Sequence, residues 1–148
     1  MRRGIVRHPY YLEEQRLDEL LGFDFTFLAI DSAKARKTIF DGLLARKVPF
    51  LDVGMDIGIA KSGGLRGMAR YTVGLPDHHA HLEYVVSLGQ GEDDGVYRNI
   101  QVADLNMLNA AMAVVKWKKS RGFYEDDIRE HHSVYNVPTH GLTKEDRK

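Results

Sequence analysis

The segment Gly22–Met55 constrains the fold of this chain more than any other, because it has the pattern of a strand, a helix and a second strand. Phe23–Ile30 is mostly apolar and aromatic, which predicts a strand covered on both faces, as in a parallel sheet. Ala33–Arg46 follows with apolar residues at helical spacing, and Val48–Val53 is a second short apolar run. Two strands joined through a helix are expected to be parallel neighbours with a right-handed crossover.

The carboxyl ends of these two strands are the expected place for chemistry, because ligands of open α/β sheets bind outside this edge. Asp31 and Ser32 follow the first strand, and residues 52–54 close the second. The simplest interpretation of Asp31 or Ser32 is an N-cap of the next helix. For Arg36 it is a solvated helix residue or a weak surface ion pair.

The chain after this unit predicts a hairpin. Gly54–Gly67 holds five glycines and is typical of a loop, although Ile57–Ala60 within it has the character of a strand. Met68–Leu75 and Ala80–Leu88 then predict two antiparallel strands around the turn residues Pro76–His79.

A long helix and a final strand complete the predicted elements. The helix spans Ile100–Arg121, with Asn99 as its cap and Gly122 as its stop. Its predicted core face consists of Val102, Leu105, Leu108, Met112 and Val115. His131–Val137 is the expected last strand.

Composition excludes several classes of function. The chain has 148 residues, the size of one domain, with 21 Lys plus Arg and 21 Asp plus Glu, so its formal charge is zero. Bulk electrostatics therefore gives no reason to expect a nucleic-acid or membrane-surface partner. No apolar run reaches the roughly 20 residues needed to span a bilayer. The absence of cysteine excludes disulfides, cysteine zinc sites and a cysteine nucleophile, and a cytoplasmic location is expected.

Two further site types are weighed and disfavoured. His78, His79 and His81 form one cluster and His131 and His132 another. No cysteine and no H-E-x-x-H spacing accompanies them, so a polar surface role is favoured over a metal site. A Rossmann-type oxidoreductase half is disfavoured because no G-x-G-x-x-G follows a strand.

The order of these features resembles the second half of the ThiF/MoeB/HesA adenylyltransferases, relatives of the ubiquitin-activating enzymes. The resemblance rests on D-x-x-x-x-R from Asp31 to Arg36, on the strand Val48–Gly54, and on the hairpin and long helix that follow. It implies an α/β fold: a Rossmann-like mixed sheet with a parallel βαβ unit, an antiparallel hairpin and a long C-terminal helix.

The resemblance also implies a domain organisation. Residues 23–137 are expected to be the carboxyl-terminal half of the family's domain, with residues 1–22 an extended lead-in and 138–148 a polar tail. The family's glycine-rich first half has no counterpart in this sequence. The chain is therefore expected to be a truncated or split half that needs the other half for catalysis.

The implied function is ATP-dependent adenylation of a carboxylate, such as the C-terminus of a ubiquitin-like or small sulfur-carrier-like protein. ATP and magnesium are the implied cofactors and a homodimer the implied assembly. Asp31 would be the catalytic and magnesium-binding residue, and Ser32 and Arg36 would join it in binding the nucleotide. The alternative is a non-catalytic protein-interaction or dimerisation module derived from the same family.

Overall fold

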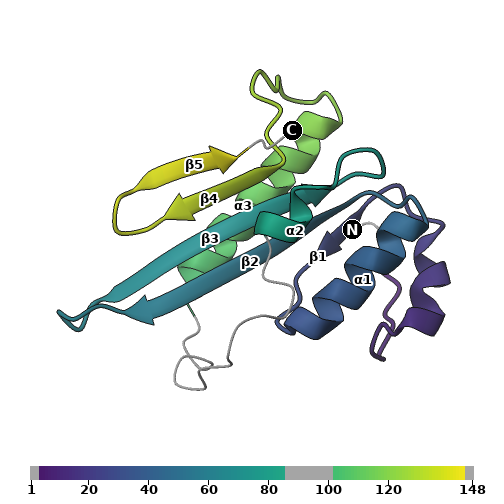
Figure 1. Ribbon diagram of the computed structural model, residues 1–148, viewed down its shortest axis with the longest axis horizontal. Coiled ribbons are helices and arrows are strands. Elements are labelled where there is room, and N and C mark those ends of the chain that lie inside the picture. The colour runs from purple at the N-terminus through teal and green to yellow at the C-terminus, as the bar shows by residue number, and fades with distance from the viewer. Residues whose placement is uncertain (1–3, 86–101, 146–148) are drawn as a thin grey trace.

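The computed structural model describes residues 4–85 and 102–145 and shows an α/β structure in which helices cover both faces of one sheet (Figure 1). The helices are η1 (Glu14–Leu20, a 3-10 helix), α1 (Ala33–Ala45), α2 (Leu82–Val85) and α3 (Ala103–Ser120), and the strands are β1 (Thr26–Leu28), β2 (Phe50–Ile59), β3 (Leu65–Gly74), β4 (His132–Asn136) and β5 (Gly141–Glu145). This confirms the predicted fold class.

The sheet is mixed and open, with the strand order β1-β2-β3-β4-β5. Only the first pair is parallel, and its register sets Leu28 opposite Asp52. The other pairs are antiparallel, and Gly54 lies opposite Arg70 between β2 and β3. The predicted βαβ unit is therefore present at one edge of an otherwise antiparallel sheet.

Two sets of apolar contacts hold the layers together. Alternate residues of a strand face opposite sides of a sheet, so Phe50 packs toward α1 while Leu51 packs toward α3. The cluster on the α1 side contains Leu17, Leu28, Ile39, Phe40, Leu43, Val48, Phe50 and Leu82. The clusters on the α3 side contain Leu51, Tyr71, Val73, Ala113, Ile57, Ala69 and Leu105.

The hairpin lies elsewhere than the sequence predicted. β2 continues to Ile59 through the segment predicted as a glycine-rich loop, and its hairpin partner is β3. The turn occupies residues 60–64, where Gly63 has a φ of 85° that favours glycine. The predicted strand Ala80–Leu88 contains helix α2 instead, and its last three residues lie outside the described residues.

Helix α3 presents a different face to the sheet from the one predicted. Leu108 and Val115 were expected in the core, yet they are 37% and 43% exposed. Asn109 is buried instead, and its Nδ2 donates a hydrogen bond to the Gly54 carbonyl at 2.9 Å. Small side chains on this face, such as Ala113, let the helix approach the bulky residues of the sheet.

The ends of the elements complete the comparison with the sequence. Gly122 stops α3 with a φ of 71°, as predicted, whereas Asn99 lies outside the described residues. The predicted first strand is only Thr26–Leu28 long, and Phe27 is 47% exposed, so this strand is not covered on both faces. The expected polar tail contributes β5 to the sheet. None of the helices described here is long and apolar enough to cross a membrane.

Candidate functional site

The turn between β1 and α1 brings Asp31 and Ser32 to the carboxyl end of the parallel strand pair. The Ser32 Oγ accepts a hydrogen bond from the Ala35 backbone N–H at 3.3 Å, so Ser32 is the N-cap of α1. Asp31 is exposed. Its carboxylate therefore faces solvent beside the helix N-terminus, where the helix dipole favours negative charge.

Arg36 lies one turn into α1 and is buried against the sheet. Its Nε donates to Asp52 Oδ1 at 3.2 Å, and its Nη2 donates to the Ile30 carbonyl. Only 11% of the side chain is exposed. Arg36 therefore joins α1 to the ends of β1 and β2, and the prediction of a solvated residue or weak surface pair is wrong, because its partner Asp52 is buried and lies 16 residues away in the sequence.

A second arginine reaches the same carboxylate from β3. Arg70 Nη1 lies 2.8 Å from Asp52 Oδ2 and donates to Thr72 Oγ1 at 3.2 Å. Thr72 Oγ1 is in turn 2.8 Å from His132 Nδ1 on β4. We call Arg36, Asp52, Arg70, Thr72 and His132 the polar cluster; it runs across β2, β3 and β4 on the α1 side of the sheet.

Burial dominates the electrostatics of this cluster. Desolvation raises the pKa of Asp52, and the two guanidinium groups oppose that effect. Desolvation also lowers the pKa of Arg70, again against the attraction of Asp52. The two arginines share one fully buried carboxylate, so positive charge exceeds negative charge among these three side chains.

The side chains at this edge offer few ligands for a magnesium ion. Among the residues that the structure describes, no three His, Asp or Glu side chains are grouped to hold a metal ion. One exposed carboxylate does suit magnesium, which usually keeps several waters and takes substrate phosphates as further ligands. A magnesium site built on Asp31 would take its other ligands from waters and from a bound phosphate group.

The histidines lie around the start of α2. The rings of His78 and His131 are in contact, with centroids 3.9 Å apart and planes tilted by 31°, and the His81 ring centroid lies 5.3 Å from that of His78. His81 is buried and its Nε2 is 2.9 Å from the Val73 carbonyl oxygen, whereas His79 is exposed. Burial lowers the pKa of His81 to about 4. This arrangement gives His81 a structural role.

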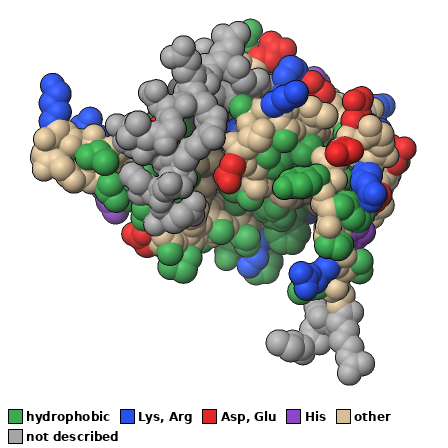
Figure 2. Space-filling model, turned by 90° about the horizontal axis from the view of Figure 1, so that it is seen from below, with side chains coloured by type: hydrophobic (Ala, Val, Ile, Leu, Met, Phe, Trp, Pro, Cys, Tyr) green, Lys and Arg blue, Asp and Glu red, His purple; other side chains and the backbone are tan. Residues whose placement is uncertain are grey.

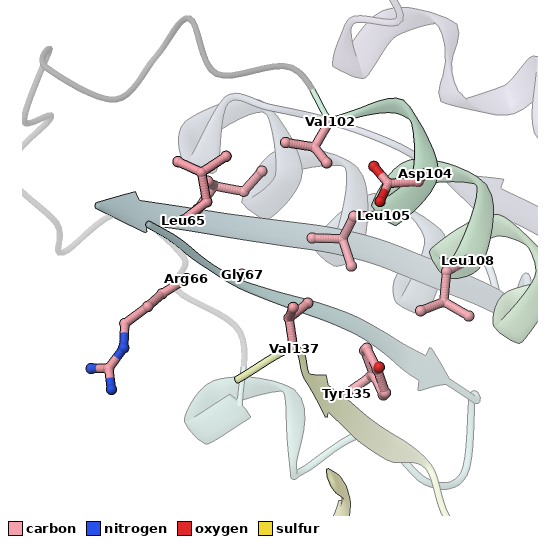
Figure 3. Close-up of a pocket in the computed structure, with 10 residues that line it drawn as sticks. Leu65, Arg66, Gly67, Val102, Asp104, Leu105, Leu108, Tyr135 and Val137 are labelled. Carbon is pink, nitrogen blue, oxygen red and sulfur yellow. The ribbon is translucent and has the colours of Figure 1, made fainter. Parts of the chain in front are cut away.

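A separate cavity of about 320 Å³ lies on the α3 side of the sheet (Figure 3). It is lined by Ile57, Leu65, Arg66, Gly67, Val102, Asp104, Leu105, Leu108, Tyr135 and Val137. Its walls are mainly apolar, and Arg66 points away from the cavity. Ligand sites normally combine apolar walls with several convergent polar groups, so we do not place chemistry here.

Comparison with known proteins shows a fold but no family. No protein-family model matches the chain, and no curated protein is recognisably similar in sequence. Among solved structures, the chain is similar to the crystal structure of selenomethionine PaaA, with a TM-score of 0.54 and 15% identity. The match covers 90% of this chain and 46% of PaaA, so the chain spans about half the length of that protein.

These findings correct the family suggested by the sequence. Membership of the ThiF/MoeB/HesA adenylyltransferases is not supported by any family model or curated protein, and the structural likeness to PaaA shows only the fold. The structure also gives a physical reason why D-x-x-x-x-R is not specific. Ser32 caps the helix and Arg36 pairs with Asp52, and these local roles are available to any strand–helix unit.

Proposed function

We propose that the chain binds magnesium-ATP at the carboxyl end of β1 and, with a completing protein segment, transfers an adenylyl group to a carboxylate. The observation that carries this proposal is the exposed Asp31 carboxylate between β1 and the capped start of α1. Arg36 and Asp52 support it by fixing that turn against β2. A carboxylate at this position suits magnesium that is already bound to phosphates.

In the proposed reaction, an oxygen of the acceptor carboxylate attacks the α-phosphorus of ATP. The bond between that phosphorus and the bridging oxygen breaks, and pyrophosphate leaves. The acceptor is a protein C-terminus such as that of a small ubiquitin-like protein. Because the reaction consumes ATP, we place it in the cytoplasm. The completing segment supplies further cations for the phosphates, whose charge must be neutralised in the transition state.

Calorimetry with magnesium-ATP tests the nucleotide site. We expect binding that weakens about tenfold or more in Asp31→Ala, because the variant loses the carboxylate that faces the cation. Asp24→Ala is the matched control, because Asp24 is an exposed aspartate on the amino side of the same strand. Absence of binding, or equal binding by Asp31→Ala, would refute the proposal.

A second candidate function, a dimerisation module, is favoured by the outer face of α3. On this helix Met107, Leu108, Val114 and Val115 are between 37% and 67% exposed. Figure 2 shows one face of the molecule, on which hydrophobic side chains lie at the surface among charged ones. Asp104 lies near the start of the helix and Lys118 near its end. If two copies of α3 lay antiparallel, Asp104 of each copy would lie near Lys118 of the other. A two-fold interface brings the same two residues together twice in this way.

Light scattering after gel filtration tests this candidate. A dimer that dissociates in Val114→Lys but persists in Asn106→Lys would support it, because Asn106 is an exposed polar residue of the same helix. A monomeric wild-type chain would exclude it.

A further inference from the structure

Arg70 lies across β2 in a position that only glycine at position 54 allows. A Cβ atom on Gly54 would be 2.6 to 2.7 Å from Nη2, Cζ and Nε of the Arg70 guanidinium. Real Cβ atoms do not approach other heavy atoms so closely. The guanidinium therefore rests directly on the β2 backbone, one strand away from β1.

Only Nη1 of the Arg70 guanidinium contacts polar side chains in the described part of the chain. Nη1 contacts Asp52 at 2.8 Å and Thr72 at 3.2 Å. Within residues 4–85 and 102–145, Nε and Nη2 donate to no side chain or carbonyl, and neither is among the buried atoms that lack a partner. The side chain is 16% exposed. The Nε–Nη2 edge, which lies over Gly54, is thus a pair of parallel donors without a partner in this part of the chain.

The charges around Arg70 leave this edge without a counter-ion. Arg36 donates a hydrogen bond to Asp52 Oδ1, and Arg70 forms an ion pair with Oδ2, which accepts no hydrogen bond from the described residues. Asp56 is on the same face of β2 but is exposed, and it forms no ion pair with Arg70 in the described part of the chain. One positive charge of the polar cluster is therefore not balanced by these residues.

We infer that the Nε–Nη2 edge of Arg70 binds an oxyanion, and that this oxyanion is the acceptor carboxylate of the proposed reaction. Arginine offers two parallel N–H groups that match two oxygens of one carboxylate. The register places the site near the carboxyl end of β1: Leu28, the last residue of that strand, is opposite Asp52, two residues before Gly54, on which Arg70 lies. The bound carboxylate would lie one strand from the Asp31 turn.

This inference rests on the proposed function only for the identity of the ligand. The donor edge and the unbalanced charge are independent of any nucleotide. Inorganic phosphate presents similar oxygens, so the experiment must separate the two anions.

NMR of the arginine side-chain Nε–H signals provides the test on the full chain. The Arg70 signal is assigned by its loss in Arg70→Lys. We expect N-acetylglycylglycine, which has a free carboxylate, to shift this signal saturably, and its C-terminal amide to leave it unchanged. Arg70→Lys keeps the charge but loses the fork, and should weaken binding about tenfold or more, measured by backbone amide shifts. Arg66→Lys should bind normally, because Arg66 is an exposed arginine on the same face of β3.

Several results would overturn the inference. These are an Arg70 signal that does not move, equal effects of the acid and the amide, equal losses in Arg66→Lys and Arg70→Lys, or a response to inorganic phosphate alone. If Arg70→Lys does not fold, the Arg70 Nε–H signal is assigned instead through its bonds to the assigned backbone, so the wild-type titration still tests the inference. Calorimetry with magnesium-ATP on the same sample separates the two proposals. A peptide response without ATP binding would refute the proposed function but keep the oxyanion site, and the reverse result would refute only the site.

Discussion

Replacing Asp52 with asparagine should destabilise the fold strongly, because Asp52 is the only carboxylate between two arginines of the polar cluster. Its side chain is fully buried, and its oxygens lie 3.2 Å from Arg36 Nε and 2.8 Å from Arg70 Nη1. Asparagine has nearly the same size, so packing is preserved. The variant removes the negative charge and leaves two guanidinium groups close together in the protein interior.

The expected cost follows from known effects on buried ion pairs. Removing one partner typically costs about 3–5 kcal/mol. The arginine side chains are 11% and 16% exposed, so they can recover some hydration, and the lower value of about 3 kcal/mol applies. For a chain of this size, that loss corresponds to a fall in melting temperature of about 6–12 °C.

Urea unfolding measures this loss directly. Trp117 is the single tryptophan and its ring packs 6.0 Å from that of Phe27, so its fluorescence reports the contact between α3 and β1. Asp56→Asn is the matched control, because Asp56 is exposed on the same face of the same strand, and its change should stay within about 0.5 kcal/mol. A loss below about 1 kcal/mol for Asp52→Asn would show that Asp52 does not hold the two arginines together.

Two further variants test the described packing. Burial lowers the pKa of His81 to about 4 from 6.5, so between these values the unfolded chain binds a proton that the folded chain does not. The free energy of unfolding should therefore fall as the pH is lowered from 6.5 to about 4, by up to about 1.4 kcal/mol per pH unit. Urea unfolding should show that this pH dependence is weaker in His81→Gln and unchanged in His79→Gln. Asn109→Ala loses the hydrogen bond to the Gly54 carbonyl and should lower the free energy of unfolding by about 1–3 kcal/mol. Urea unfolding should show a loss of about 0.5 kcal/mol or less for Asn106→Ala, which changes an exposed residue of the same helix.

The βαβ unit could be predicted from the sequence because its signals are local. Ile39 and Leu43 repeat at helical spacing and are both buried on α1, as the pattern indicated. The face of α3 could not be predicted in this way. Its sequence has apolar or alanine side chains on most sides, so hydrophobicity alone did not distinguish the buried Asn109 and Ala113 from the exposed Leu108.

Arg70 was missed because its role depends on contacts distant in sequence. A single arginine in an apolar strand is normally interpreted as an outward-facing residue. Its position follows from the pairing of Gly54 with Arg70 between β2 and β3, whereas the glycine-rich pattern from Gly54 onward predicts a loop. A glycine opposite an arginine in a predicted hairpin would have been the useful signal, because it leaves space for the guanidinium on the neighbouring strand.

Stability alone does not account for the polar cluster. α1 already packs on the sheet through Ile39, Phe40 and Leu43, and a buried ion pair is often no more stabilising than apolar side chains of similar volume. A second guanidinium adds a desolvation cost without adding a second carboxylate. The exposed fractions rise from 0% for Asp52 to 11% for Arg36 and 16% for Arg70. Asp52 thus holds both arginines from the interior side. The donors of Arg36 bond to Asp52 and to the Ile30 carbonyl, whereas Arg70 keeps a pair of donors without a partner among the described residues. This is the order expected when a buried charge positions a more exposed binding residue.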